Sequence, residues 1–400
     1  MKNIPRNVCL LTIVLITFST CSPLEKKKLN WYKGNLHTHT YWSDGDEFPE
    51  MVLDWYKNHG YDFVALSDHN TMAIDEKWKL ITNSPLYEES FRKYLEKFGE
   101  EWVEYKTDTG RIQVKLKTFP EYKSKMEEAG FLVIPSEEIT NNVNNAPVHI
   151  NATNLQEFVA PPNAATVAET MQQTIDAVLE QRRRTGVPMF THINHPNFYW
   201  AITLEDMVSL KGEQFFEVYN GHPMVRNYGD STHLSTEAMW DKINVAYANR
   251  NQSLMFGLGT DDSHNYHQFG EAFSNAGRGW VMVQAESLET ASLIMALEAG
   301  NFYSSTGVTL RELVFENNEL KVKVAPEKEV NYTIEFIGVR KDEKEARIIK
   351  TLNGNEGSFS VTDEFLFVRA RVISTKRQSN PFQEGDYEMA WTQPVMFSKY

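Results

Sequence analysis

The sequence predicts an α/β protein in which a sheet, open or closed into a barrel, precedes a smaller antiparallel β unit. Its 400 residues, 41% of them hydrophobic, suffice for one large domain and one small domain. Between Gly34 and Gly307, short apolar runs alternate with amphipathic stretches, which indicates parallel strands and covering helices. After Gly307, β-branched and aromatic runs separated by turn residues predict antiparallel strands.

The first 21 residues differ from the rest. Lys2 and Arg6 precede an apolar run at 8–18 that is too short to span a bilayer comfortably and is typical of a secretory signal. Residues 18–21 resemble a bacterial lipobox ending at Cys21. We expect residues 1–21 to be a lipoprotein signal peptide and 22–33 a tether. A lipid on Cys21 would hold the protein at the bacterial cell envelope, in the periplasm or on the outer surface. An ordinary cleaved signal with an incidental cysteine is the alternative.

Charge and cysteine content restrict the chemistry. The net charge of −14 argues against a nucleic-acid polymer as partner, whereas a small phosphorylated substrate stays possible because bound cations would supply positive charge. The two cysteines, Cys9 and Cys21, both lie in the leader. The remaining chain therefore has no disulfide and no thiolate ligand, and any metal must be held by imidazole and carboxylate.

Seven buried strands and five helices are expected in the large domain, residues 34–307. The strands are expected at 35–37, 63–67, 131–134, 148–150, 189–192, 215–218 and 255–258, and the helices at 50–57, 119–129, 167–184, 236–250 and 288–298. Residues 76–118 interrupt this rhythm and predict an inserted helical subdomain with a hairpin near 108–111, either a lid over a pocket or a decorative loop. The C-terminal unit, 308–400, is expected to contain strands at 310–315, 320–324, 332–339, 347–351, 365–373 and 394–397.

Histidines and acidic residues gather where these strands end. His37 and His39 are two positions apart after the first strand, and Asp44 can turn back toward them because Gly45 follows it. His69 follows the second strand, with Asp68 beside it as a group that could orient a ligand imidazole. Functional residues of α/β barrels occupy such strand ends, so these side chains predict one shared site.

The later strands repeat the pattern. Either Glu137 or Glu138 could bridge two cations after the third strand. The remaining members of the pattern are His149, His192, His195, Asp262 and His264. Any one histidine could be structural, but so many buried imidazoles would be costly without partners. Neutral imidazole and carboxylate suit Zn, Mn or Fe.

The ordered motifs resemble those of the PHP (polymerase and histidinol phosphatase) superfamily over residues 34–307. The set comprises His-x-His-Thr-x-x-Ser-Asp-Gly, Ser-Asp-His-Asn, a Glu before Ile-Thr, an isolated His, His-Pro and Asp-x-His. The resemblance implies a distorted (β/α)7 barrel with two or three divalent metal ions at the carboxyl ends of its strands. The implied ligands are His37, His39, Asp44, His69, Glu138, His149, His195, Asp262 and His264, with Glu138 as the bridge. The C-terminal β unit looks like that of a secreted PHP subgroup.

The expected function is hydrolysis of a small phosphate mono- or diester, with a hydroxide bridging the metals and attacking phosphorus in line. Asp68 or His192 could orient ligands or handle a proton, and Glu217, Asn220 and His222 could line the pocket. Arg226 and Arg278 could grip an anion, although surface exposure is the expected place for both. The alternatives are a hydrolase of a carboxyl ester, carbamate or amide, and a non-catalytic metal- or ligand-binding envelope lipoprotein.

Overall fold

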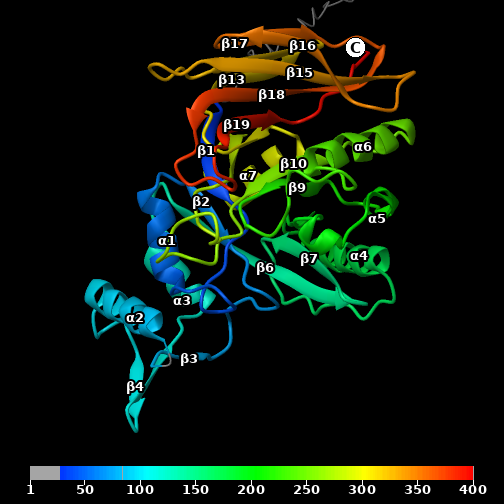
Figure 1. Ribbon diagram of the computed structural model, residues 1–400. Helices are drawn as coiled ribbons and strands as arrows, with labels where there is room; N and C mark the ends of the chain where they lie inside the picture. The colour runs from blue at the N-terminus through cyan, green and yellow to red at the C-terminus, as the bar shows by residue number, and fades with distance from the viewer. Residues whose placement is uncertain (1–27, 83, 400) are drawn as a thin grey trace, which may run out of the picture.

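The computed structural model describes residues 28–82 and 84–399 (Figure 1). The expected signal peptide, with Cys21, and most of the expected tether lie outside the described residues. Among the helices that are described, none is long and apolar enough to cross a membrane.

A mixed sheet of 13 strands forms the centre of the described chain, in the order β10-β9-β8-β7-β6-β2-β1-β11-β12-β19-β18-β15-β16. Its first nine strands are β1 (Asn30–Asn35), β2 (Phe63–Leu66), β6 (Leu132–Val143), β7 (Ala146–Thr153), β8 (Phe190–Ile193), β9 (Phe215–Asn220), β10 (Phe256–Thr260), β11 (Trp280–Ala285) and β12 (Phe302–Ser305). The β1–β2, β2–β6, β8–β9 and β9–β10 pairs are parallel, and the α/β class is confirmed.

The expected closed barrel is not observed, because the backbone ladder does not close. β12 pairs with β11 on one edge and with the C-terminal strand β19 (Tyr387–Thr392) on the other. No edge of β12 is left for β10, which instead meets it through a side chain: Ser304 Oγ donates to Gly257 O at 2.8 Å. The sheet therefore curves back on itself without the last ladder of a barrel.

Five helices lie where the sequence predicts them, within a few residues. They are α1 (Pro49–Asn58), α3 (Phe119–Met126), α4 (Val167–Thr185), α6 (Thr236–Asn249) and α7 (Thr290–Glu298). Local signals set their ends: the Thr166 side chain caps α4 by accepting from Glu169 N, and Gly186 ends it in a left-handed conformation. The short α5 (Leu204–Ser209) and the strands β11 and β12 were not predicted, and β1 ends at Asn35, the first residue of the expected 35–37 strand.

The insertion at 76–118 forms a small α/β layer that projects from the body beside α1 (Figure 1). It consists of β3 (Trp78–Leu80), α2 (Pro85–Phe98), β4 (Tyr105–Asp108) and β5 (Arg111–Lys115). The predicted hairpin is confirmed, since β4 and β5 pair through Asp108 and Arg111. Buried Phe91, Tyr94 and Val114 pack it into one hydrophobic cluster with α1.

The C-terminal strands form two layers around one apolar core. The second layer is a three-stranded sheet of β13 (Leu310–Glu316), β14 (Glu319–Val324) and β17 (Glu356–Ser360). It faces β15 (Tyr332–Arg340), β16 (Arg347–Asn353) and β18 (Phe365–Arg377), and the core between them includes Val322, Phe336 and Val372. This is sandwich-like, but one layer continues the main sheet. The strand predicted at 394–397 is wrong: only an isolated bridge joins Val395 to Val368, and β19 precedes it.

Candidate metal centre

The nine residues implied as ligands converge on one end of the main sheet. His37 and His39 follow β1, His69 follows β2, Glu138 lies in β6 and Asp262 follows β10. The other four are placed as follows: Asp44 in the turn before α1, His149 in β7, His195 after β8 and His264 after β10. Neighbouring parallel strands end at the same edge, and this register brings residues distant in the chain together.

Glu138 occupies the middle of this cluster. Its Oε2 lies 3.0 Å from His69 Nδ1, 3.1 Å from His39 Nε2 and 3.3 Å from His37 Nε2. Its Oε1 lies 3.0 Å from His149 Nδ1 and accepts from Asn194 Nδ2 at 2.7 Å. Glu138 therefore has one oxygen facing each half of the site, as a bridging carboxylate requires.

The adjacent Glu137 faces away, because successive side chains of a strand point to opposite faces. Its Oε2 accepts a hydrogen bond from Val159 N at 3.1 Å. Burial raises the pKa of Glu137 to about 8. The two glutamates thus lie in separate environments, and the one that the motif resemblance indicates is the one in the cluster.

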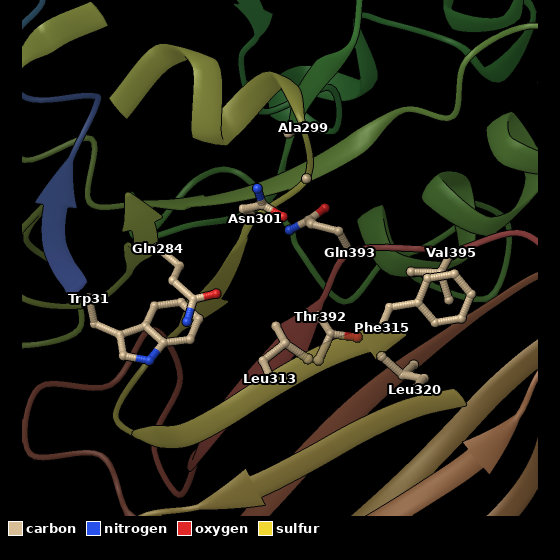
Figure 2. Close-up of a pocket in the computed structure, with 11 residues that line it drawn as sticks. Trp31, Gln284, Ala299, Asn301, Leu313, Phe315, Leu320, Thr392, Gln393 and Val395 are labelled. Carbon is tan, nitrogen blue, oxygen red and sulfur yellow. The ribbon is translucent and has the colours of Figure 1, made fainter. Parts of the chain in front are cut away.

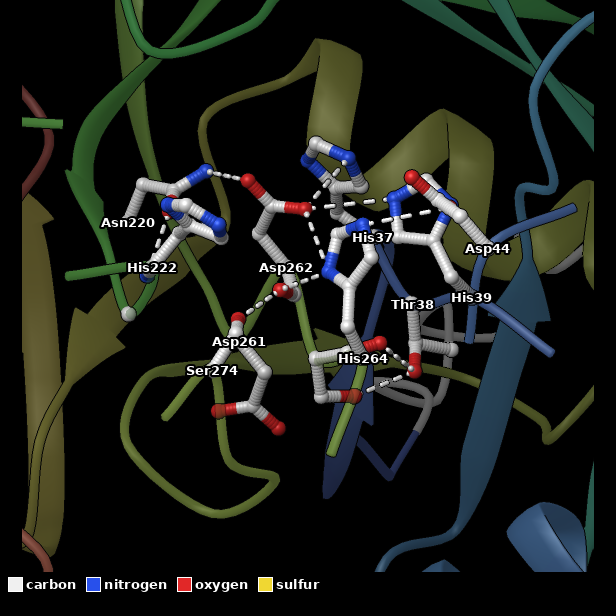
Figure 3. A network of polar contacts seen from close by, with 12 residues as sticks. His37, Thr38, His39, Asp44, Asn220, His222, Asp261, Asp262, His264 and Ser274 are labelled. Carbon is white, nitrogen blue, oxygen red and sulfur yellow. Dashed lines mark hydrogen bonds and ion pairs between the residues drawn. The ribbon is translucent and has the colours of Figure 1, made fainter. Parts of the chain in front are cut away.

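Asp262 is the second central carboxylate. Its Oδ1 lies 3.3 Å from His37 Nε2 and 3.2 Å from His39 Nε2, while Oδ2 accepts from Asn220 Nδ2 at 3.1 Å (Figure 3). The Asp262 backbone is left-handed, with φ of 49°. Such a conformation is unfavourable for a non-glycine residue and is concentrated at functional sites; here it accompanies a carboxylate placed between two imidazoles.

Asp44 and His264 form the outer side of the site. Asp44 Oδ1 lies 3.3 Å from His264 Nε2, and Asp44 Oδ2 lies 3.6 Å from His69 Nε2. The Asp44 side chain is 58% exposed, so this side is open to solvent. The tight turn depends on Gly45, because a Cβ there would lie 2.6 Å from Thr40 N.

These residues enclose a pocket of about 150 Å³. Its lining consists of Asp44, His69, Glu138, His149, His195, Phe198, His222, Asp262 and His264. His195 Nε2 lies farther from the carboxylates than the other imidazoles, at 3.7 Å from Glu138 Oε1 and 3.8 Å from Asp262 Oδ2. No described residue of the 76–118 insertion is in this lining, and the two alternatives for it, a lid or a decorative loop, both stay predictions.

The side chains fit divalent cations. His37 Nε2 and Glu138 Oε2 are fully buried and have no hydrogen-bond partner among the described residues, which is costly unless another ligand satisfies them. Imidazole nitrogens and carboxylate oxygens bind such ions at about 2.0–2.2 Å, so two ligands of one ion lie roughly 3 Å apart. Among the described residues, four overlapping sets have all their potential ligand atoms within 4.8 Å of one another: His39-Asp44-His69-His264, His37-His39-Glu138, His37-His192-Glu217 and His69-Glu138-His149.

The electrostatic field of the site also favours cations. Burial alone would raise the pKa of Glu138, but the charges of His69 and His37 hold it well below its usual range. Asp262 behaves in the same way: burial opposes ionisation, and the charge of His37 with the hydrogen bond to His39 lowers its pKa well below the usual value. In this structure the charges of the neighbouring histidines balance the two buried carboxylates, and bound cations could take over that role beside neutral imidazoles.

Asp68 and His192, the two residues expected to orient ligands or move protons, lie behind the pocket. Buried Asp68 accepts from Thr40 N and Thr40 Oγ1 at 2.8 Å each and from Ser43 Oγ at 2.6 Å. Because Ser43 Oγ lies 3.3 Å from His39 Nδ1, Asp68 is linked to the His39 imidazole through one hydroxyl. His192 is fully buried, and Phe190 and His37 flank its ring. Neither residue is among those that line the pocket.

Glu217 supports the site more directly than the sequence indicated. Its Oε1 lies 2.6 Å from His37 Nδ1, and its Oε2 accepts from His195 N at 2.8 Å. A carboxylate on the second nitrogen of a ligand imidazole fixes the ring and raises its basicity. Asn194, which bonds Glu138, was missed altogether; its position between His192 and His195 was the available signal.

Neither arginine considered as an anion clamp reaches the pocket. Arg278 is 1% exposed, contrary to the expected surface location, and donates to Gly221 O and Phe273 O at 2.8 and 2.6 Å. Arg226 is exposed and stacks over the Trp200 ring. Both arginine side chains therefore make contacts outside the pocket.

Comparisons with known proteins give structural neighbours only. No family model and no curated protein matches the sequence. One neighbour is a two-domain protein from Bacteroides vulgatus containing a predicted PHP-like metal-dependent phosphoesterase, with TM-score 0.42 and 14% identity over 92% of this chain and 96% of that one. Another is a putative metal-dependent phosphoesterase from Bifidobacterium adolescentis, with TM-score 0.29 and 12% identity over 58% of this chain and 87% of that one. Both neighbours are described as predicted or putative metal-dependent phosphoesterases, and the first of them as PHP-like.

Proposed function

We propose that this protein is a metal-dependent hydrolase that cleaves a small phosphate mono- or diester. The observation that carries the proposal is Glu138, a buried carboxylate with imidazoles within 3.3 Å of both of its oxygens and a second carboxylate, Asp262, sharing His37 and His39. A purely structural role rarely gathers so many imidazole nitrogens and carboxylate oxygens in one open pocket.

Two or three divalent cations would be held by the nine converging residues. Such ions supply Lewis-acid activation of water and neutralise negative charge on a phosphoryl group. The protein's own contribution is orientation: Glu217 fixes His37, Asn194 fixes Glu138, and Asn220 fixes Asp262 through the hydrogen bonds described above. The choice among Zn, Mn and Fe stays a proposal based on the imidazole and carboxylate donors.

His222 is the pocket residue best placed to contact a substrate. Its Nδ1 accepts a hydrogen bond from Met224 N at 3.2 Å, which leaves the proton on Nε2. Its ring lies between Phe198 and His264, with centroids at 5.9 and 5.5 Å. An Nε2–H donor in this wall would bind a phosphoryl oxygen and stabilise charge that develops there.

One observation favours a second candidate, a hydrolase of carboxyl esters, carbamates or amides. The described residues that line the pocket include no lysine or arginine, so no side-chain cation is available to clamp a phosphate. A carbonyl substrate needs no such clamp. A purely binding role is less consistent with the open side at Asp44, where solvent reaches the cluster.

The decisive experiment combines metal counting with substrate screening on residues 22–400. Bound metals are measured by mass spectrometry, and p-nitrophenyl phosphate, bis-p-nitrophenyl phosphate and p-nitrophenyl acetate are assayed in parallel with Zn, Mn or Fe. We expect at least two metals per chain and turnover of a phosphate ester that is lost in His39→Ala. Fewer than two metals with no ester turned over would refute the hydrolase, and turnover of the acetate alone would select the second candidate.

We also propose that Cys21 carries a lipid that holds the protein at the cell envelope. The support is the order of basic, apolar and small residues in positions 1–21. Fractionation of cells tests it: the natural chain should be found with membranes, and Cys21→Ser should move to the soluble fraction. Equal membrane association of both would contradict the lipid anchor.

A further inference from the structure

A second cavity, of about 260 Å³, lies where the main sheet meets the C-terminal layer. It is lined by residues of β1, β11, β13 and β14, the turn after α7 and the segment that ends β19. None of its lining residues belongs to the lining of the metal pocket. The cavity is therefore a separate feature that the proposed hydrolysis does not use.

The lining carries no charge. Its residues are Trp31, Gln284, Ala299, Gly300, Asn301, Leu313, Phe315, Leu320, Thr392, Gln393 and Val395. Ion pairing therefore contributes nothing to binding here, which argues against phosphorylated or carboxylated ligands. A neutral ligand fits this lining best.

The two sides of the cavity differ in character. Figure 2 shows Trp31 and Gln284 on one side, and Phe315, Leu320 and Val395 on the opposite side. Trp31 and Gln284 are directly opposed partners of the β1–β11 ladder. The Trp31 ring is held edge-on against Tyr303 with centroids 5.1 Å apart, so the indole is fixed before any ligand arrives.

Several polar groups of the cavity are free to bind a ligand. The side-chain amides of Gln284 and Asn301 and the indole N–H of Trp31 have no hydrogen bond to any described protein group, and all three residues are at least partly exposed. The Gln393 amide, by contrast, is already hydrogen-bonded at both ends: its Oε1 accepts from Gly257 N at 2.8 Å and its Nε2 donates to Gly257 O at 3.0 Å. The cavity thus offers unpaired donors and acceptors on Gln284, Asn301 and Trp31, whereas Gln393 is held in place by its two hydrogen bonds.

From this combination we propose that the cavity binds one neutral sugar unit of a saccharide. A sugar ring presents C–H groups, which pack on an aromatic face, and hydroxyls at its edge, which exchange hydrogen bonds with carboxamides. Both kinds of partner are present and unpaired here. A fatty acyl chain would cover the apolar side but leave the amides without partners, at a cost of about 1–3 kcal/mol for each buried group.

The test uses the full chain and ligand-detected NMR with neutral saccharides: glucose, galactose, xylose, N-acetylglucosamine, maltose, cellobiose and lactose. We expect saturable binding of at least one, and quenching of tryptophan fluorescence by the same ligand. Trp31→Ala and Asn301→Ala should each weaken binding tenfold or more. Trp78→Ala, which removes an indole from the distant β3, should leave it unchanged.

Circular dichroism and thermal unfolding keep the outcome interpretable, since Asn301 is exposed and its replacement should not affect folding. His39→Ala separates the two sites: saccharide binding must survive the loss of the metal centre. The proposal is overturned if no neutral saccharide binds, if binding persists in folded Trp31→Ala, or if only decanoic acid or glucose 6-phosphate binds. Failure of ester hydrolysis would leave this result untouched.

Discussion

Two neighbouring glutamates of β6 allow a matched test of the metal centre. Glu138→Gln keeps the shape of the side chain but removes its charge and one acceptor oxygen, so it cannot bridge cations. We expect Glu138→Gln to lose at least one metal per chain and to lose more activity than the roughly 10–100-fold that follows from removing a group that only orients a ligand. Metal content is measured by mass spectrometry after gel filtration.

Glu137→Gln is the control, because it makes the same chemical change on the opposite face of the strand. It should keep its metals and most of its activity. Equal metal content in the two variants would contradict the placement of Glu138 at the centre of the site.

His222 allows a different prediction, since it lines the pocket without being among the implied ligands. His222→Ala should retain its metals but lower kcat by about 10²-fold, the usual effect of removing one donor from a developing charge. His233→Ala is the matched control, because His233 stacks on Trp200 at the surface and is not part of the lining. Loss of metal from His222→Ala would instead make it a ligand.

At the residue level, the sequence predicted which side chains converge on the site, but not which residues hydrogen-bond to them and orient them. The ordered motifs indicated Glu138 rather than Glu137, and the structure places Glu138 in the cluster. The contacts of Glu217 to His37 and of Asn194 to Glu138 join strands that are far apart in the chain. Such pairs depend on sheet register, which local patterns do not contain.

At the level of elements, helices were predicted well because their signals are local. The caps Thr166 and Ser235 and the periodicity of α4 are all readable in a short window. Barrel closure was not predictable in this way, since it depends on which strand takes the free edge of β12. β19, from the far end of the chain, takes it.

The junction between α6 and β18 leads to a stability prediction. Arg369 is 1% exposed and donates to both oxygens of Asp241 at 2.7 Å, with Glu237 at 2.9 Å and the Trp240 ring below it. Removing the cation leaves buried Asp241 without its partner, while Glu237 keeps only its pair with Arg371. Arg369→Met should therefore lower the free energy of unfolding by about 3–5 kcal/mol.

Urea unfolding measures this change. The control is Arg340→Met in β15, where the pair with Glu364 is exposed and worth no more than about 1 kcal/mol. If both variants lost the same stability, the buried cluster around Arg369 would contribute no more than an exposed ion pair.

For the whole molecule, Glu213 predicts how stability depends on pH. Burial raises its pKa to about 8, although Thr191 Oγ1 and the N–H groups of Phe215 and Gln214 bond to it. Between the ordinary glutamate pKa and 8, the folded chain keeps a proton that the unfolded chain releases. The contribution to stability is thus full at low pH and is lost as the pH rises through this window.

Glu213→Gln abolishes that ionisation. The fall in unfolding free energy between pH 5 and pH 8 should become smaller in the variant by up to a few kcal/mol, since one pKa unit corresponds to about 1.4 kcal/mol. Urea unfolding at both pH values measures the difference, with the exposed Glu205→Gln as control. An unchanged slope would show that Glu213 is ionised in the folded state.

Metal removal should lower the thermal stability of the whole fold, because the converging residues come from strand ends between His37 and His264. Cations bound only by the folded state stabilise it by about 2.7 kcal/mol at a hundredfold excess over Kd. Without them, the buried Glu138 and Asp262 are balanced only by histidine charges, among them that of His37. EDTA should therefore lower Tm by several degrees, and Zn or Mn should restore it.

The same treatment of Glu138→Gln should produce a smaller shift in Tm, because that variant has already lost the carboxylate that the cations are proposed to share. If EDTA left the Tm of the natural chain unchanged, bound metal would not contribute to the stability of the fold.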